Sequence, residues 1–258
     1  MTRRFHATAA LWLWLGGVAT GCEAMSADEL DEALELDTEG EEPSVATALT
    51  SAARVVGSAA DDELLVRQWL QWSLAQPWST GPVSATSTSC GSTQGSGPWF
   101  LAGTAGGSAT RECTIPADTE LFFPLLNGWA IVPAELLEGE EPLQDAFPAA
   151  FEAIGDQHAD TCALTLRIDG QDVAAGFEQL HEDFHVEILE PFEVDVNSDD
   201  PVSGSPQGGG PVHAVTAGYY VHLAPLSPGD HVLELGGALC SGPKTFETSV
   251  TYTVHIAR

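Results

Sequence analysis

Glycine and proline interrupt this chain so often that long regular elements have little room to form. Together, 26 Gly and 16 Pro make up 42 of the 258 residues, which exceeds the average share of roughly 12%. Between these turn signals lie short apolar or alternating segments, the pattern of short strands. They cover residues 99–102, 111–115, 120–126, 162–168, 219–223, 231–235 and 246–256.

Two segments have helical spacing instead. Leu65, Trp69 and Trp72 recur every three or four residues, and Pro77 ends the pattern. At this spacing both tryptophans are predicted to be core residues rather than a sugar-stacking platform. A second, acidic helical segment spans residues 133–157. The whole pattern predicts a mainly β fold over residues 61–258: a β-sandwich of jelly-roll or immunoglobulin-like type, with two peripheral helices at one side.

The charge of the chain restricts its partners. The sequence has 38 Asp plus Glu against 8 Lys plus Arg, a formal net charge of −30. Such a chain repels phosphate backbones and anionic membrane surfaces. We therefore expect no nucleic acid partner, and a protein or a carbohydrate as ligand, with neither favoured.

The first 22 residues resemble a bacterial lipoprotein signal. Arg3 and Arg4 precede an apolar run over residues 7–18, and small residues then lead to Cys22. Twelve residues of helix rise about 18 Å, too short to cross roughly 30 Å of hydrocarbon. The resemblance implies that Cys22 carries the lipid anchor, although Ala19 stands where leucine is usual. A plain secretory signal is the alternative. We expect an extracytoplasmic protein that meets the membrane of the cell envelope only through this lipid.

Residues 23–60 predict a disordered tether. They contain ten acidic residues, one basic residue (Arg54) and no aromatic side chain. A segment with so much charge and so little apolar surface cannot build a core.

Four cysteines remain once Cys22 is set aside, an even number in a chain bound for an oxidising compartment. Two disulfides are therefore predicted. Of the three possible connectivities, Cys90–Cys113 with Cys162–Cys240 is favoured, because the first pair brackets one glycine-rich segment and the second ties an early strand to a late one. Zinc binding by these cysteines is disfavoured because no C-x-x-C occurs.

Several short motifs lie along the main domain. They are WxxW at 69–72, Cys90, GPWFLAGT at 97–104, RECTIP at 111–116, LFFP at 121–124 with Asn127, and LAPLSPGDH at 223–231. Together they resemble the motifs of a family of uncharacterised secreted proteins of soil bacteria. The resemblance covers most of residues 61–256 and implies no activity. This chain departs from the family at Trp129, where the family commonly has a cysteine, and at Asp118-Thr119, where the family has Gly-Lys.

The sharpest local signal is HEDFH at residues 181–185, a match to H-E-x-x-H. On a helix, His181 and His185 would bind zinc and Glu182 would activate the bound water for peptide hydrolysis. The alternation of apolar residues from Phe184 to Val196 is longer, however, and favours a strand over this segment. A zinc metallopeptidase is therefore the alternative function rather than the leading one.

Asp195, Asn197 and Asp199 offer hard oxygen ligands at alternate positions, as calcium loops do. The run lacks the glycine and the distal glutamate of an EF-hand, so an acidic turn is favoured over a calcium site. His222 and His231 lie on predicted neighbouring strands and could face each other. No G-x-S-x-G is present for a serine hydrolase.

These observations favour an envelope-anchored extracytoplasmic lipoprotein with a non-catalytic binding or structural β-sandwich. No cofactor is expected in this interpretation, apart from calcium at Asp195, Asn197 and Asp199 if that loop binds a cation, or zinc in the metallopeptidase alternative.

Overall fold

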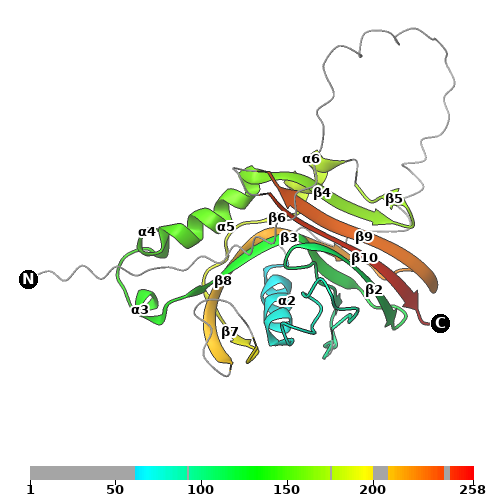
Figure 1. The fold of residues 1–258 in the computed structure, drawn as a ribbon, viewed down its shortest axis with the longest axis horizontal. Coiled ribbons are helices and arrows are strands. Elements are labelled where there is room, and N and C mark those ends of the chain that lie inside the picture. The colour runs from blue at the N-terminus through cyan, green and yellow to red at the C-terminus, as the bar shows by residue number, and fades with distance from the viewer. Residues whose placement is uncertain (1–61, 92, 175, 200–208, 241–244) are drawn as a thin grey trace, which may run out of the picture.

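The computed structural model describes residues 62–91, 93–174, 176–199, 209–240 and 245–258. The predicted signal, Cys22 and the predicted tether lie outside these residues. Ten strands form two five-stranded sheets, so the predicted β-sandwich is confirmed (Figure 1). Sheet A contains β1 (Trp99–Phe100), β3 (Leu121–Val132), β6 (His185–Val186), β7 (Phe192–Val196) and β8 (Gly210–Leu223). Sheet B contains β2 (Gly107–Ile115), β4 (Thr161–Ile168), β5 (Gln171–Asp172), β9 (Gly229–Leu239) and β10 (Phe246–Ile256).

Both sheets are mixed. Sheet A has the order β1-β3-β8-β6, with β7 also on β8, and sheet B has the order β2-β10-β9-β4-β5. The pairs β1–β3 and β2–β10 are parallel, and the other pairs are antiparallel. The parallel pairs distinguish this sandwich from the antiparallel sheets of an immunoglobulin domain.

The main core lies between the two sheets. On β10, Val250, Tyr252 and Val254 are buried while their neighbours are more exposed, so one face of the strand points inward. On β8, Tyr219 and Val221 meet them from sheet A. Alternation thus fixes which face of sheet B is buried.

Strand β8 is buried on both faces from Ala214 to Leu223. Its even-numbered residues Ala214 and Tyr220 pack in a second core with helix α2 (Glu63–Ala75), and its odd-numbered Val215 packs in a third core with helix α5 (Pro148–Asp160). The two long helices therefore cover opposite faces of sheet A (Figure 1), and the expectation that they lie at one side is wrong. A strand that is apolar on both faces needs cover on both sides.

The helical segment 133–157 is broken into three pieces. Helices α3 (Ala134–Leu137) and α4 (Leu143–Ala146) each begin directly after a proline, and α5 follows them. Proline has no N–H to donate, so it suits the start of a helix better than its interior.

Both predicted disulfides are confirmed. Cys90–Cys113 joins the loop before β1 to β2, with a Cα–Cα distance of 5.9 Å, and Cys162–Cys240 joins β4 to the end of β9, with 5.8 Å. Two disulfides are typical of an oxidising, extracytoplasmic compartment. In the described part of the chain, no helix has the length and apolar character to span a membrane.

Candidate functional site

The described residues form a pocket of about 110 Å³ between α2 and sheet A, partly open to solvent. Four aromatic side chains line it: Trp69, Trp78, Trp129 and Phe246, and we call it the tryptophan pocket. They come from α2, from the turn after α2, from β3 and from the start of β10. Residues distant in sequence thus converge on one concave surface, which is the usual form of a small-ligand site.

Trp69 forms the deep wall and is held rigidly. Its side chain is buried, and its indole N–H donates to the carbonyl oxygen of Leu101 at 2.8 Å. Its ring meets the ring of Tyr220 edge-on, with 5.9 Å between centroids. The sequence prediction that Trp69 and Trp72 are core residues is confirmed, since both are buried, and Trp69 also contributes to the pocket.

A β-bulge in β3 aims Trp129 at the pocket. The register with β8 shifts between Pro124 and Leu126, so that Leu125 and Leu126 both face the core between the sheets. Beyond the shift, Asn127 and Trp129 point to the α2 side, the opposite side from the one an unbroken alternation would give them.

Gly218 makes this bulge possible. It pairs with Asn127 and has a φ of +147°, and a Cβ placed on it would lie 2.4 Å from the carbonyl oxygen of Leu126. Any side chain at position 218 would push β3 away from β8 and move the pocket wall.

Trp78 lies in the turn after α2, and Asp199 fixes this turn. The Asp199 carboxylate accepts hydrogen bonds from the backbone N–H of Trp78 at 2.6 Å and from the N–H and hydroxyl of Ser79 at 3.1 and 2.8 Å. Partial burial opposes ionisation of Asp199, but the hydrogen bonds from Trp78 and Ser79 outweigh it and lower its pKa. A negative charge is therefore held next to the Trp78 wall.

Three polar side chains of the pocket, those of Gln76, Thr104 and Asn127, already have partners within the protein. The amide N–H of Gln76 donates to the carbonyl oxygen of Trp72 and to the Thr93 hydroxyl, and the Thr104 hydroxyl donates to the carbonyl oxygen of Gly107. Asn127 is hydrogen-bonded to the Tyr220 hydroxyl. None of the described lining residues is charged. The pocket thus presents mainly aromatic and other apolar surface.

Buried Arg111 holds the loop wall of the pocket from behind. Its guanidinium donates to the carbonyl oxygens of Ala102 at 2.7 Å and Gly103 at 3.3 Å, and it also donates to the Tyr252 hydroxyl at 2.7 Å. Gly103 lines the pocket, whereas Arg111 does not. A buried cation with its N–H groups directed at carbonyl oxygens fixes the loop without needing a carboxylate.

The strand prediction for HEDFH is wrong for its first three residues. His181, Glu182 and Asp183 end helix α6 (Phe177–Asp183), and only His185 lies on a strand, β6. Gly176, with a φ of +126°, starts this helix. Leu180 in this helix and Phe184 directly after it are both buried in the main core. The helix therefore buries apolar side chains, as the predicted strand would have done.

The two histidines of this motif flank one aromatic ring. The centroids of the His181 and His185 rings lie 5.4 and 5.3 Å from that of Tyr219. Glu182 is exposed. Across the described ranges, no group of three or more His, Cys, Asp or Glu side chains is arranged to hold a metal ion. The described residues therefore do not supply the third protein ligand that a zinc peptidase needs.

The acidic turn at 195–199 is hydrogen-bonded to α2 and to the residues that follow it. The side-chain amide of Asn197 donates to the carbonyl oxygen of Ala75 at 3.0 Å, and Asp199 holds the turn at Trp78. The backbone N–H of Asp195 donates to the Gln71 side-chain oxygen at 2.9 Å. Asn197 and Asp199 thus complete the C-terminal end of a helix, and calcium binding stays a prediction.

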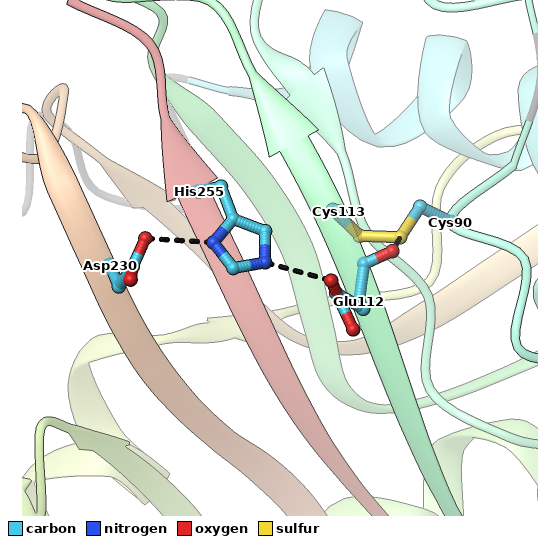
Figure 2. A network of polar contacts seen from close by, with 5 residues as sticks. All are labelled: Cys90, Glu112, Cys113, Asp230 and His255. Carbon is cyan, nitrogen blue, oxygen red and sulfur yellow. Dashed lines mark hydrogen bonds and ion pairs between the residues drawn. A yellow bond between two sulfur atoms is a disulfide. The ribbon is translucent and has the colours of Figure 1, made fainter.

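A network of charged groups crosses the outer face of sheet B. His255 on β10 lies between Asp230 on β9, at 2.8 Å, and Glu112 on β2, at 3.0 Å, next to the Cys90–Cys113 disulfide (Figure 2). Hydrogen bonds to Asp230 and then to Glu112 raise the pKa of His255. Three strands are joined through one histidine side chain.

His231 contacts a serine and an aspartate, the residue types of a Ser–His–Asp triad. Its Nδ1 lies 2.8 Å from the Asp169 carboxylate, and its Nε2 lies 2.9 Å from the backbone oxygen of Ser227 and 3.3 Å from the Ser227 hydroxyl. Burial alone would lower the pKa of His231, but the hydrogen bonds to Asp169 and to the Ser227 backbone, together with the charges of Asp169 and Asp230, outweigh it and raise the pKa. Because Nε2 donates to a carbonyl oxygen, it cannot take the serine proton as a base.

His222 does not face His231, because β8 and β9 belong to different sheets. It lies instead between Asp62 and Glu120, with both contacts at 3.1 Å, and its side chain is 10% exposed. We call this group the His222 clamp. It joins the start of α2 to sheet A.

The tryptophan pocket has no signature in the sequence. Trp129 stands out there only as a departure from a family pattern, and Trp78 and Phe246 carry no signal beyond their aromatic rings. Comparison with protein-family models, with curated proteins and with solved structures finds no match to this chain. The resemblance to secreted proteins of soil bacteria stays a prediction, and the function has to be argued from the geometry of the pocket itself.

Proposed function

We propose that this protein is a non-catalytic binding module, anchored by lipid at Cys22 to the outside of the cytoplasmic membrane or to another envelope surface, and that the tryptophan pocket is its ligand site. The observation that carries this proposal is the convergence of Trp69, Trp78, Trp129 and Phe246 on one partly open cavity. Rigid aromatic rings contribute much contact area at a low cost in conformational entropy.

The size of the pocket defines how much of a ligand it takes. A volume of about 110 Å³ is smaller than the roughly 300–1,000 Å³ typical of sites that enclose a whole drug-sized molecule. It suits one terminal group of a larger ligand. Two disulfides and a lipoprotein-like signal support the extracytoplasmic placement, where such a ligand would be met.

The binding proposal is tested by ligand-observed NMR on the mature domain with a panel of small neutral and cationic compounds. We expect at least one class to give a saturable signal that Trp129→Ala abolishes. Phe192→Ala is the matched control, because Phe192 is another partly buried ring on sheet A that lies outside the pocket. Equal binding by wild type and Trp129→Ala would place the ligand elsewhere and refute the proposal.

The anchor is tested separately. Cys22→Ser should move the full-length protein from the membrane fraction to the soluble fraction, because residues 23–60 offer no other apolar anchor. An unchanged membrane fraction for this variant would contradict lipid attachment at Cys22.

A further inference from the structure

We propose that the tryptophan pocket binds a quaternary ammonium group, the cationic end of a choline-type compound. This inference rests on the proposed function and names its ligand class.

The first argument is the chemistry of the walls. A cation over the face of an aromatic ring is attracted by the ring quadrupole, most strongly by tryptophan, and cages of such rings recognise quaternary ammonium groups. Trp69, Trp78, Trp129 and Phe246 provide four rings around one cavity. Three of the four are the residue type that binds cations best.

The second argument is size. An engineered cavity of about 150 Å³ holds benzene. A cavity of about 110 Å³ therefore takes a more compact group, such as a nitrogen with its methyl substituents. The partly open mouth leaves room for the fourth substituent of that nitrogen to extend into solvent.

The third argument is that three polar side chains of the pocket are already engaged. The Gln76 amide N–H, the Thr104 hydroxyl and the Asn127 side chain are hydrogen-bonded within the protein. To bind a saccharide through these groups, the protein would have to give up hydrogen bonds of its own, which costs free energy. A quaternary ammonium group has no N–H or O–H at its charged centre and needs no such exchange.

The fourth argument is charge. The chain carries a formal net charge of −30, so the field of the whole protein attracts cations. Nearer the pocket, the Asp199 carboxylate is held at the backbone of Trp78. Arg111 stands behind the loop wall, where its N–H groups are directed at carbonyl oxygens and its guanidinium carbon lies 5.4 Å from the ring centroid of Tyr252.

The test compares choline with its neutral isostere, 3,3-dimethylbutan-1-ol, by NMR titration of the mature domain. The two differ in charge and little in shape. Choline should bind about tenfold more tightly than the alcohol, in the range that cation–π contacts supply. Methyl glucoside serves as the carbohydrate probe and should bind more weakly than either.

Two variants locate the effect in the pocket. Trp129→Phe keeps a ring and should retain part of the preference for choline, whereas Trp129→Ala should lose it. Asp199→Asn removes the charge but offers the Trp78 turn one acceptor oxygen in place of two, so its effect is measured as the ratio of choline affinity to alcohol affinity. This ratio should fall about two- to threefold, since only the charged ligand senses the carboxylate.

The outcomes separate the two proposals. If the alcohol or the glucoside binds as tightly as choline, the cationic inference is overturned while the pocket remains a binding site. If no probe binds and the folded wild type shows no saturable signal with the wider panel either, both proposals fail. Near-UV circular dichroism of each variant establishes that it is folded.

Discussion

The two sheets of this sandwich are held in place by different means. Sheet A is packed on both faces: its central strand β8 contacts α2 on one side, and sheet B and α5 on the other. Sheet B leaves one face to solvent and is joined instead by two disulfides and by the His255 network across three strands. A pocket needs a third layer for its walls, and among the described residues α2 supplies this layer on sheet A, with its C-terminal half at the tryptophan pocket.

The largest expected effect concerns the covalent link in sheet B. Replacing Cys162 and Cys240 together by serine opens a loop of 78 residues and should lower the free energy of unfolding by about 4–5 kcal/mol in the chain-entropy model. Cys90→Ser with Cys113→Ser opens a loop of 23 residues and should cost about 3 kcal/mol. Urea denaturation measures both, and a larger loss from the shorter loop would contradict this ranking.

The next effect concerns the packing of sheet A. Leu70 on α2 is fully buried, so Leu70→Ala should reduce the free energy of unfolding by about 3 kcal/mol and should also weaken ligand binding, since α2 carries one pocket wall. Leu64 on the same helix is 65% exposed and provides the control, with an expected change within about 0.5 kcal/mol. Similar losses for the two variants would mean that α2 is not a structural layer of sheet A.

A smaller effect concerns the pH dependence of stability, which should arise from two histidines of sheet B. The pKa values of His231 and His255 are raised above 6.5, so their stabilising contribution is fully present below that pH and is lost as pH rises through the folded-state pKa. The melting temperature should therefore fall by roughly a few degrees between pH 6 and pH 8. The double variant His231→Asn with His255→Asn should flatten this profile, and a profile that keeps its slope would assign the effect to other groups.

The smallest expected effect is that of salt. Residues 61–258 carry 28 acidic and 5 basic residues, and screening of their repulsion should raise the melting temperature by about one or two degrees. Calcium and sodium chloride at matched ionic strength should give equal shifts, because the Asp199 oxygens already accept hydrogen bonds. A larger shift with calcium, measured by calorimetry, would support calcium binding at Asp195, Asn197 and Asp199.

Local patterns predicted much of this fold. The spacing of Trp69 and Trp72 indicated α2, short apolar or alternating segments indicated β4 and β10, and the even cysteine count with the spacing of the four residues led to both disulfides. Strands β3 and β8 extend well beyond the expected residues 120–126 and 219–223. Each of these signals comes either from a single helix or strand or from the tendency of cysteines to pair. For such features, local sequence was sufficient.

The pocket could not be predicted in the same way. The direction of Trp129 depends on a bulge in β3, and that bulge depends on the absence of a side chain at Gly218, a partner brought alongside by tertiary pairing. The helix at 177–183 was missed because Phe184, Val186 and Val194 suit the apolar alternation of a strand, while burial of Leu180 and Phe184 decides for a helix. Both cases depend on contacts between elements.

The position of the His222 clamp has a mechanical consequence. Asp62 directly precedes α2 and lies 3.1 Å from His222 on β8, so tension passed along the chain into α2 goes through a residue that His222 holds. With the lipid anchor at Cys22 that we propose, a pull on the domain would load the clamp and α2, the helix that carries Trp69. Force applied at the anchor and occupancy of the pocket would then act on the same helix from its two ends.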